Sequence, residues 1–323
     1  MKMLITGGAG FIGSHLGQYL LSLGHTVTAV DILSTGQIDN IAHLQPHENF
    51  HFVKGSITDV ETMDQLIKEC DIVFHLAAVV GVQLVVSQPV QTLETNVFGT
   101  EIVLKAAHRH HKKILIASSS EVYGKGVRIP FSEDDDRLLG PTTSTRWGYA
   151  ASKALDEFLA LGYYQEYDLP VVIFRLFNTV GPRQTGRYGM VIPRFVRQAL
   201  SNDPMTIYGD GSQTRCFCDV ADVVRAITAL ATLPEAVGQV FNIGGSEEIS
   251  ITALAQKVIE LTASQSSLTY IPYEQAYGVD FQDMLRRVPD TRKIKETADW
   301  TPTYNLTEIL QRIIDHIRMT NDE

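Results

Sequence analysis

Short apolar runs alternate along the chain with longer amphipathic stretches. The runs KMLIT, TVTAV, FHFV, IVFHLAA, KILIAS and VVIFRL are rich in Val and Ile and have the length of strands, whereas FIGSHLGQYLLSL has the spacing of a helix. Strands that are apolar on both faces and are separated by helices are typical of a parallel sheet covered on both sides. The pattern therefore predicts a doubly wound α/β fold, in which ligands bind at the carboxyl ends of the strands.

This alternation becomes less regular after Arg175. Pro and Gly accumulate in GPRQTGRYG and NDPMTIYGDGSQ, and shorter amphipathic stretches such as SITALAQKVIEL and LTEILQRIIDHI follow. We expect one domain over residues 1–176, to which 217–240 returns, and a smaller α/β substrate-binding domain formed by 177–216 and 241–323.

Composition excludes several classes of function. The 323 residues are 44% hydrophobic, enough for a large core, and the net charge of -10 offers no electrostatic footprint for nucleic acid or an anionic membrane. No apolar stretch approaches the roughly 20 residues of a membrane span, and the N-terminal residues lead into a strand rather than a signal peptide, so we expect a cytoplasmic protein. Three cysteines without paired spacing predict reduced thiols and no metal site.

A glycine-rich turn joins the first predicted strand to the first predicted helix. In LITGGAGFIG, the residues Gly7, Gly10 and Gly13 allow a tight turn and bring helix N-terminal amides close to a pyrophosphate. Asp31 ends the next strand, where a carboxylate can accept hydrogen bonds from both ribose hydroxyls and would repel a 2'-phosphate. No Lys or Arg follows Asp31 within twenty residues, so the pattern favours NAD over NADP in a Rossmann-type domain.

Further motifs make the likeness to a known family specific. The glycine run, HLAA at 75–78, NVFGT from Asn96, SSSEVYG at 118–124, and Tyr149 with Lys153 in GYAASK resemble the extended short-chain dehydrogenase/reductases of the nucleotide-sugar type. RLFNTVGPR, YGDGSQTRCF and RRVPDTRK are similar to the family's substrate-side motifs and occur in the same order, so the resemblance covers nearly the whole chain.

The resemblance implies a set of residues around NAD. Ser56 departs from the family, which commonly has an acidic residue there near the adenine. The implied cofactor-binding residues are Gly7, Gly10, Phe11, Ile12, Gly13, Asp31, Ser56, Ile57, Leu76, Ala77, Ala78, Asn96, Tyr149 and Lys153.

Tyr149 and Lys153 resemble the family's catalytic pair. Residues four apart share a helix face, so we expect the Lys153 charge to stand beside the Tyr149 hydroxyl and to favour the phenolate. A phenol with a pKa near 10 needs such help, because oxidising a sugar alcohol requires a base for the hydroxyl proton. Ser119 looks like the catalytic serine that hydrogen bonds the substrate hydroxyl.

Glu121 bears on the choice of reaction. Galactose-type epimerases usually have a small residue at this position, decarboxylases of UDP-glucuronate resemble this chain in having Glu, and 4,6-dehydratases have an Asp-Glu pair. Here Ser120 precedes Glu121. The dehydratase alternative therefore lacks its acid, and a loop carboxylate bonded to the backbone is the plainest alternative for Glu121.

The resemblance also implies substrate contacts. Asn178, Arg215 and Arg287 resemble ligands of the UDP pyrophosphate, Tyr208 lies where a ring packs near the uracil, and Ser120 joins them as a substrate-side residue.

Arg187 adds a cation that a neutral hexose does not need. GPRQTGRYGMVIPRF resembles bacterial UDP-glucuronate 4-epimerases, in which an Arg at this position holds the sugar's C6 carboxylate. A loop Arg paired on the surface is the simpler alternative for Arg187.

Among the candidate functions, the sequence favours a UDP-glucuronate 4-epimerase, which works through a 4-keto intermediate. UDP-glucuronate decarboxylation, 4-epimerisation of UDP-glucose or UDP-N-acetylglucosamine, and a non-catalytic NAD sensor follow as alternatives. Relatives pair through the helices that here span about 90–108 and 148–165, so we expect a homodimer.

Overall fold

The computed structural model describes residues 1–126, 128–186, 190–277 and 284–321. A seven-stranded sheet forms the larger body, in the order β11-β6-β5-β4-β1-β2-β3, and every neighbouring pair is parallel. Its strands are β1 (Lys2–Thr6), β2 (Thr26–Asp31), β3 (Phe50–Lys54), β4 (Ile72–His75), β5 (Lys113–Ser119), β6 (Val171–Leu176) and β11 (Gln239–Ile243). The predicted doubly wound α/β fold is confirmed.

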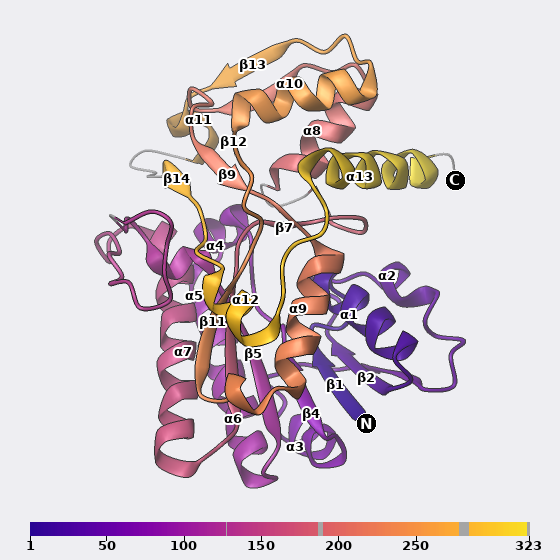
Figure 1. Ribbon diagram of the computed structural model, residues 1–323, viewed down its shortest axis with the longest axis vertical. Coiled ribbons are helices and arrows are strands. Elements are labelled where there is room, and N and C mark those ends of the chain that lie inside the picture. Colours follow the sequence, from indigo (N-terminus) through magenta and orange to yellow (C-terminus); the bar gives the residue numbers. More distant parts are fainter. Residues whose placement is uncertain (127, 187–189, 278–283, 322–323) are drawn as a thin grey trace.

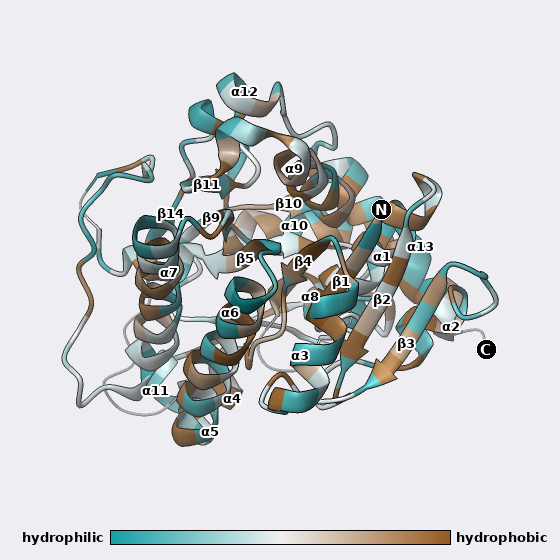
Figure 2. Ribbon diagram, turned by 90° about the horizontal axis from the view of Figure 1, so that it is seen from below, coloured by the Kyte–Doolittle hydropathy of each residue, from teal (hydrophilic) through white to brown (hydrophobic). Residues whose placement is uncertain are grey.

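Helices cover both faces of this sheet, and Figure 2 shows apolar strands between helices whose outer faces are hydrophilic. The helices around one face are α3 (Val60–Glu69), α6 (Gly99–Arg109) and α7 (Gly148–Tyr167); those around the other are α1 (Phe11–Ser22), α9 (Val220–Thr232) and α12 (Arg292–Ala298). Two apolar clusters form the core, one on each side, and both contain fully buried strand residues such as Ile5 and Ile116. Shorter helical segments are α2 (Asp39–Ala42), α4 (Val82–Ser87), α5 (Pro89–Leu93), the π-helical turn Glu94–Phe98, and the single turns Ser120–Tyr123, Thr145–Trp147 and Pro234–Ala236.

A smaller lobe lies above the carboxyl ends of the strands (Figure 1). Its elements are β7 (Thr179–Val180), α8 (Val191–Leu200), β8 (Met205–Tyr208), β9 (Thr214–Cys216), β10 (Cys218–Asp219), β12 (Glu248–Ser250), α10 (Ile251–Thr262), β13 (Leu268–Ile271), α11 (Tyr273–Tyr277), β14 (Arg286–Arg287) and α13 (Leu306–Asn321). A separate apolar cluster, with Phe195, Leu254 and Leu310 at its centre, holds α8, α10 and α13 together.

The chain passes between the two bodies several times. After passing through the smaller lobe, the chain re-enters the larger body with α9. The sequence predicts that residues 217–240 belong to the larger body, and in the structure this segment continues to Ile243, the last residue of β11. Ile294 and Trp300 pack into the core of the larger body although they lie within the predicted C-terminal domain. Pairing of β11 with β6 places the first of these segments in the larger body, and burial of the Ile294 and Trp300 side chains places the second there.

Two further sequence expectations can be compared with the structure. Cys70, Cys216 and Cys218 are free and buried, as predicted. Within the described ranges, no helix combines the length and the apolar character that crossing a membrane requires.

Candidate active site

A cleft of about 480 Å³ opens between the carboxyl ends of the strands and the smaller lobe. This is the edge at which doubly wound sheets bind ligands. Most of the predicted site residues line it: Gly7, Gly10, Phe11, Ile12, Gly13, Asp31, Leu76, Ala77, Ala78, Ser119, Ser120, Glu121, Tyr149, Lys153, Asn178, Tyr208, Arg215 and Arg287. Strands, loops and helices that lie far apart in the sequence thus contribute residues to one cavity.

The glycine turn has the close backbone packing that the pattern predicts. Gly7 has a φ of +70°, and a Cβ on Gly13 would lie only 2.2 Å from the carbonyl oxygen of Gly7. Helix α1 begins directly behind this turn, its N-cap Gly10 makes no side-chain cap, and its first turn holds no acidic residue. The first amides of a helix have no acceptor within the helix, so they are available to an anion in the cleft.

Asp31 lies at the end of β2 on the wall of the cleft. Its carboxylate accepts hydrogen bonds from the backbone amides of Ala9, at 3.1 Å, and Leu33, at 2.7 Å. Burial raises the pKa of Asp31, while these amides act in the opposite direction. The glycine loop and the carboxylate that follows it are therefore held as one unit, the arrangement that fits the pyrophosphate and ribose of a dinucleotide.

Three predicted cofactor residues lie outside the lining of the cleft. Ser56 follows β3 and hydrogen bonds Thr58, and Ile57 is buried in the core. Asn96 is fully buried; its side chain bonds both backbone groups of Val79 and the hydroxyl of Ser152. Asn96 thus fixes the loop after β4, and a direct contact of these three residues with the cofactor stays a prediction.

Tyr149 and Lys153 lie on consecutive turns at the start of α7, and both line the cleft. Ser119 ends β5, its hydroxyl oxygen accepts the Glu121 amide at 3.2 Å, and its nearness to the Tyr149 hydroxyl lowers the pKa of the phenol. The neighbouring Ser118 donates to the buried Glu157 at 2.5 Å, which ties the end of β5 to α7. Ser119, Tyr149 and Lys153 are thus brought together, as the motif predicts.

The charge beside Tyr149 differs from the expectation. Lys153 Nζ donates to Asp156 Oδ2 at 2.7 Å, and both side chains are almost completely buried, so a carboxylate balances the lysine charge. Burial raises the pKa of Tyr149 and the negative charge of Glu121 adds to this, whereas the neighbouring Ser119 hydroxyl and the Arg287 charge lower it. The sequence could not show this balance, because it depends on Asp156 and Arg287.

Glu121 is a largely buried carboxylate held by two guanidiniums. Arg146 Nη1 donates to Glu121 Oε2 at 2.6 Å, and Arg287 Nη1 donates to Glu121 Oε1. Burial alone would raise the pKa of Glu121, but the charges of Arg146 and Arg287 outweigh it and lower the pKa to about 2. Glu121 is therefore an anion at neutral pH, next to Tyr149, and it is not bonded only to backbone amides.

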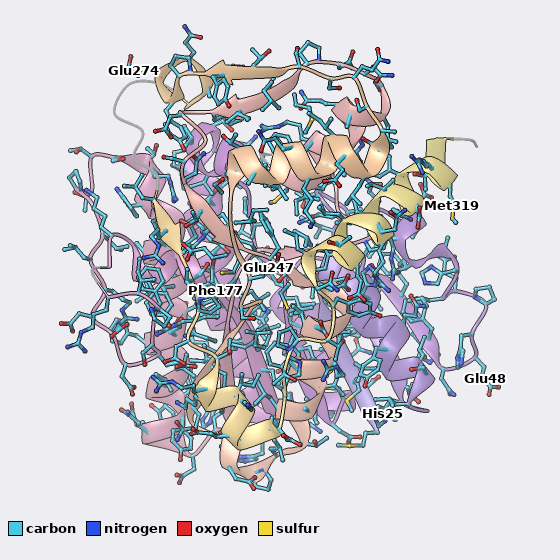
Figure 3. The ribbon with its side chains drawn as sticks, turned by 45° about the horizontal axis from the view of Figure 1, so that its top comes forward. His25, Glu48, Phe177, Glu247, Glu274 and Met319 are labelled. Carbon is cyan, nitrogen blue, oxygen red and sulfur yellow. The ribbon has the colours of Figure 1, made fainter. Side chains whose placement is uncertain are left out.

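The predicted substrate-side residues Asn178, Arg215 and Arg287 form one wall of the cleft, next to Glu121. Asn178 follows the fully buried Phe177, labelled near the centre of Figure 3; its amide oxygen accepts from Arg287 at 2.7 Å and its nitrogen donates to the Cys216 carbonyl. Arg215 Nη1 donates to the carbonyls of Thr214 and Met284, both at 2.8 Å.

Tyr208 completes this wall at the end of β8. The guanidinium of Arg194 lies 4.2 Å from the centre of its ring. The wall is therefore cationic and aromatic, which suits a nucleoside diphosphate.

Two residues of the site were not predicted from the sequence. Arg146 lies three positions before Tyr149, is buried and lines the cleft. Asp156 follows Lys153 by three positions on α7, a spacing that places the two side chains on one helix face. A search for charged residues around the motif could have found both. Arg187, which the sequence assigns to the sugar carboxylate, lies outside the described residues.

The geometry fits a dinucleotide with its nicotinamide end towards Tyr149. Besides the glycine turn and Asp31, the fit rests on the buried ammonium of Lys153, whose described protein partner is Asp156 alone. An ammonium has three donors, so two are left for hydroxyl groups in the cleft that Lys153 lines.

Comparison with known proteins agrees with this geometry. The family model described as GDP-mannose 4,6 dehydratase matches residues 4–313. A UDP-N-acetyl-alpha-D-glucosaminuronate decarboxylase of Bacillus cytotoxicus is 44% identical over 319 residues, 98% of each chain. UDP-glucuronic acid decarboxylase 1 of Danio rerio is 36% identical over 315 residues, 98% of this chain and 72% of the relative.

A solved structure extends the match to the whole fold. The UDP-glucuronic acid 4-epimerase of Bacillus cereus, in complex with UDP-glucuronic acid and NAD, superposes with a TM-score of 0.89 at 30% identity and covers 99% of this chain and 100% of its own. The chain therefore belongs to the GDP-mannose 4,6-dehydratase family, among the extended short-chain dehydrogenase/reductases that modify nucleotide sugars.

Proposed function

We propose that this protein is an NAD-dependent decarboxylase of a UDP-linked hexuronic acid. Glu121 carries the proposal: it is an ionised carboxylate held against the catalytic tyrosine by Arg146 and Arg287. The 44% identity with a UDP-N-acetylglucosaminuronate decarboxylase along the whole chain also favours decarboxylation over epimerisation. The sequence alone favours the 4-epimerase, whereas these two observations favour the decarboxylase.

The cation excess of the cleft suits such a substrate. Arg146, Arg215 and Arg287 surround Glu121, three guanidiniums to one carboxylate. A UDP-uronate brings a diphosphate and a sugar carboxylate, and guanidiniums bind both groups through charged hydrogen bonds. Asp31 in turn favours a dinucleotide with a free ribose 2'-hydroxyl, because its carboxylate would repel a 2'-phosphate.

The first step is oxidation of the C4 hydroxyl. Ser119 hydrogen bonds this hydroxyl and Tyr149 takes its proton, while Lys153 would donate to the ribose hydroxyls of a bound nicotinamide nucleotide. NAD, when bound, supplies the hydride acceptor and later the hydride donor. The sugar is then a β-keto acid, because its C4 carbonyl stands next to C5 and the C6 carboxylate.

Loss of carbon dioxide follows from this arrangement. As the C5–C6 bond breaks, its electron pair forms an enolate whose oxygen, at C4, is within reach of the Tyr149 hydroxyl proton. The enol then needs a proton at C5, a step that epimerisation does not have. Glu121, as an anion beside Tyr149, can orient a water molecule that delivers this proton.

Epimerisation at C4 is the second candidate. It is favoured by the full-length likeness to the Bacillus cereus UDP-glucuronic acid 4-epimerase. The same Ser119 and Tyr149 would serve, and the ketone would present its other face before reduction. The two reactions differ in whether the carboxylate leaves the plane of the C4 carbonyl.

A reaction in D₂O separates these candidates. Purified protein with NAD is incubated with UDP-glucuronate and, separately, UDP-N-acetylglucosaminuronate, and products are followed by NMR. Decarboxylation gives a UDP-pentose with one deuterium at C5, whereas 4-epimerisation gives a uronate without solvent deuterium. Turnover of UDP-glucose or UDP-N-acetylglucosamine alone would support a neutral-sugar epimerase, and NAD binding without any turnover would support a sensor.

Arg187 provides a test of how the uronate is recognised. We expect Arg187→Ala to lower kcat/KM for the UDP-uronate by about 10- to 150-fold, the value of one charged hydrogen bond, and to leave the affinity for UDP-glucose, measured as an inhibitor, nearly unchanged. Arg128→Ala serves as the control. Equal losses on both sugars would remove the assignment of Arg187 to the C6 carboxylate.

An apolar surface on α5, the π-helical turn and α7 supports a homodimer. Val90, Leu93, Phe98, Leu155 and Phe158 are 41% to 65% exposed there, and α5 and α7 lie against each other. We expect light scattering to give twice the 35.8 kDa chain mass, and Phe98→Arg to give monomers because a buried charge disrupts an apolar interface. Leu285→Arg, on an exposed residue elsewhere, should remain dimeric. A monomeric native protein would contradict this expectation.

A further inference from the structure

A buried ion pair adjoins the catalytic residues without lining the cleft. Glu157 lies on α7 and Arg175 on β6; Arg175 Nε donates to Glu157 Oε1 at 2.9 Å, and Arg175 Nη2 donates to Oε2 at 2.7 Å. The two side chains are 2% and 5% exposed. Glu157 Oε1 also accepts the Ser118 hydroxyl at 2.5 Å, and Arg137 Nη1 lies 3.4 Å from Oε2. Burying two charges is costly unless further hydrogen bonds of this kind satisfy them.

Hydrogen bonds extend from Arg175 across the sheet. Arg175 Nη1 donates to the Tyr123 hydroxyl at 2.8 Å, and this hydroxyl donates to Asn242 Oδ1 at 2.7 Å. Tyr123 and Asn242 are fully buried, and burial raises the pKa of Tyr123 to about 12, so the phenol keeps its proton at neutral pH. Asn242 Nδ2 donates in turn to the carbonyls of Phe131, at 2.9 Å, and Asp290, at 3.2 Å.

Strand register brings these groups together. Ser118 of β5 pairs with Arg175 of β6, and Arg175 pairs with Asn242 of β11, so the three side chains lie on one face of the sheet. We call Ser118, Tyr123, Glu157, Arg175 and Asn242 the buried network. All its side-chain nitrogen and oxygen atoms have hydrogen-bond partners. A buried network that is fully satisfied is rigid and specifies one arrangement.

The buried network fixes the catalytic helix to the segment that carries Glu121. Glu157 follows Tyr149 by two turns on the same side of α7. Ser118 and Tyr123 lie at the two ends of the segment that contains Glu121, and each is bonded to the ion pair. The carboxylate of the site and the catalytic phenol are therefore held relative to each other by contacts outside the cleft.

A second arm of the buried network reaches the strand that carries Arg287. Asn242 bonds the carbonyls of Phe131 and Asp290. The Phe131 amide donates to the Val288 carbonyl and the Asp290 amide donates to the Phe131 carbonyl, both at 2.8 Å. β14 ends at Arg287, directly before this pairing. The strand end that presents the Arg287 guanidinium is therefore fixed by the buried network as well.

We propose that the Glu157–Arg175 ion pair positions the catalytic groups. Through the buried network it sets the distance between the Glu121 carboxylate and the Tyr149 hydroxyl. Neither member of the pair lines the cleft, so the pair acts through the segments that it holds. This inference rests on the proposed function, in which Glu121 directs a proton to C5. A misplacement of about 1 Å in such a site is enough to lower a rate about 100-fold.

The simpler alternative is that the ion pair only stabilises the fold. Removing one partner of a buried pair leaves an uncompensated charge and is strongly destabilising, whereas replacing both by apolar groups of similar size is often nearly neutral. A variant that lacks both charges should therefore regain stability without regaining the hydrogen bonds to Ser118 and Tyr123. Its turnover separates the two roles.

The experiment uses the full chain with NAD and three variants: Tyr123→Phe, Glu157→Gln, and the double variant Glu157→Leu/Arg175→Met. Tyr123→Phe removes only the hydroxyl between Arg175 and Asn242. Thermal unfolding measures stability, and calorimetry measures NAD affinity. The kcat and KM for the UDP-uronate are determined at a temperature where every variant is folded, and single-turnover products are identified by mass spectrometry.

Two matched controls lie outside the lining of the cleft. Asp222→Asn removes a buried helix carboxylate that is paired with Arg225, as Glu157 is paired with an arginine. Tyr304→Phe removes a tyrosine hydroxyl that accepts a hydrogen bond from Arg312 at 3.1 Å. Both should lose stability and keep the turnover of the wild type.

We expect kcat to fall about tenfold in Tyr123→Phe and about 100-fold in Glu157→Gln and the double variant, because Glu121 is no longer held at its working distance. KM and NAD affinity should change by less than about twofold, and the share of UDP-4-keto sugar among the single-turnover products should rise. A kcat that follows thermal stability through variants and controls alike would overturn the proposal, as would a double variant that regains stability and kcat together. If Glu157→Gln does not fold, the other two variants decide.

Hydrogen exchange distinguishes failure of this inference from failure of the proposed function. The Glu121 amide donates to Ser119 Oγ at 3.2 Å, and the Gly124 amide donates to the Glu121 carbonyl at 3.0 Å, so both report on the shape of this segment. A wild-type protein that turns over no UDP-uronate removes the proposed function. Faster exchange of these two amides in Tyr123→Phe, but not in Tyr304→Phe, would still support the positioning role. Unchanged exchange in the folded variants would contradict it.

Discussion

Replacing Tyr149 by Phe is expected to lower turnover of the UDP-uronate by about 1,000-fold, within the range for loss of a general acid and base. In the proposed mechanism the phenol hydroxyl takes and returns the proton of the C4 hydroxyl, and Ser119 lies beside it; phenylalanine retains the ring but not the oxygen. NAD affinity should change by less than about twofold, because the glycine turn, Asp31 and Lys153 stay in place. Initial rates and calorimetry on the same preparation measure the two quantities.

Tyr163→Phe is the control for this variant, since Tyr163 lies on the same helix outside the lining of the cleft. It should keep wild-type turnover. Retention of a tenth or more of the activity in Tyr149→Phe would mean that another group moves the C4 proton. Equal loss of NAD binding would mean that Tyr149 acts on the cofactor rather than on the sugar.

Glu121→Gln is expected to lower formation of the UDP-pentose by about 100-fold, while oxidation at C4 still occurs once for each bound NAD and leaves NADH together with one equivalent of a UDP-4-keto sugar. The amide has the shape of the carboxylate but no charge, so it no longer orients a proton donor towards C5 and no longer balances Arg146 and Arg287. Quenched reactions analysed by mass spectrometry distinguish the keto sugar from the pentose. Equal loss of both products would contradict a role confined to C5.

The pH dependence of stability tests the ionisation of Glu121 independently of activity. Its pKa is about 2 in the folded protein and 4.5 in the absence of these partners, so its stabilising contribution is present above pH 4.5 and is lost as the pH falls through about 2. Glu121→Gln should therefore lose stability at pH 6 and approach the wild type at low pH, as measured by urea unfolding. Glu248→Gln, on an exposed carboxylate paired with Arg286 outside the lining of the cleft, controls for loss of an ion pair.

Much of the architecture could be predicted because it follows from local patterns. The strand runs KMLIT and VVIFRL are buried on both faces, and their parallel pairing follows from the helices between them. The glycine turn could be predicted for the same reason, since Gly7 and Gly13 meet within one short loop.

The charge balance of the site could not be predicted in this way. Arg287 reaches Glu121 across 166 positions of sequence, and only the fold brings β14 to the end of β5. The resemblance implies that Arg287 binds a phosphate and that Lys153 acts on the Tyr149 phenol. It does not include the carboxylates that bond these two residues in the structure. Neighbouring charges decide a pKa as much as the motif residue does, and these neighbours came from other elements.

The repeated crossing of the chain between its two bodies has a consequence for engineering. A fragment ending at residue 176 would lack β11, leaving the hydrogen-bonding edge of β6 open to aggregation. Exchanging the smaller lobe with that of a relative would require several junctions, on either side of α9, β11 and α12, because these segments belong to the core of the other body. Grafting new sugar specificity onto this enzyme is therefore better attempted by replacing side chains of the cleft than by recombining whole lobes.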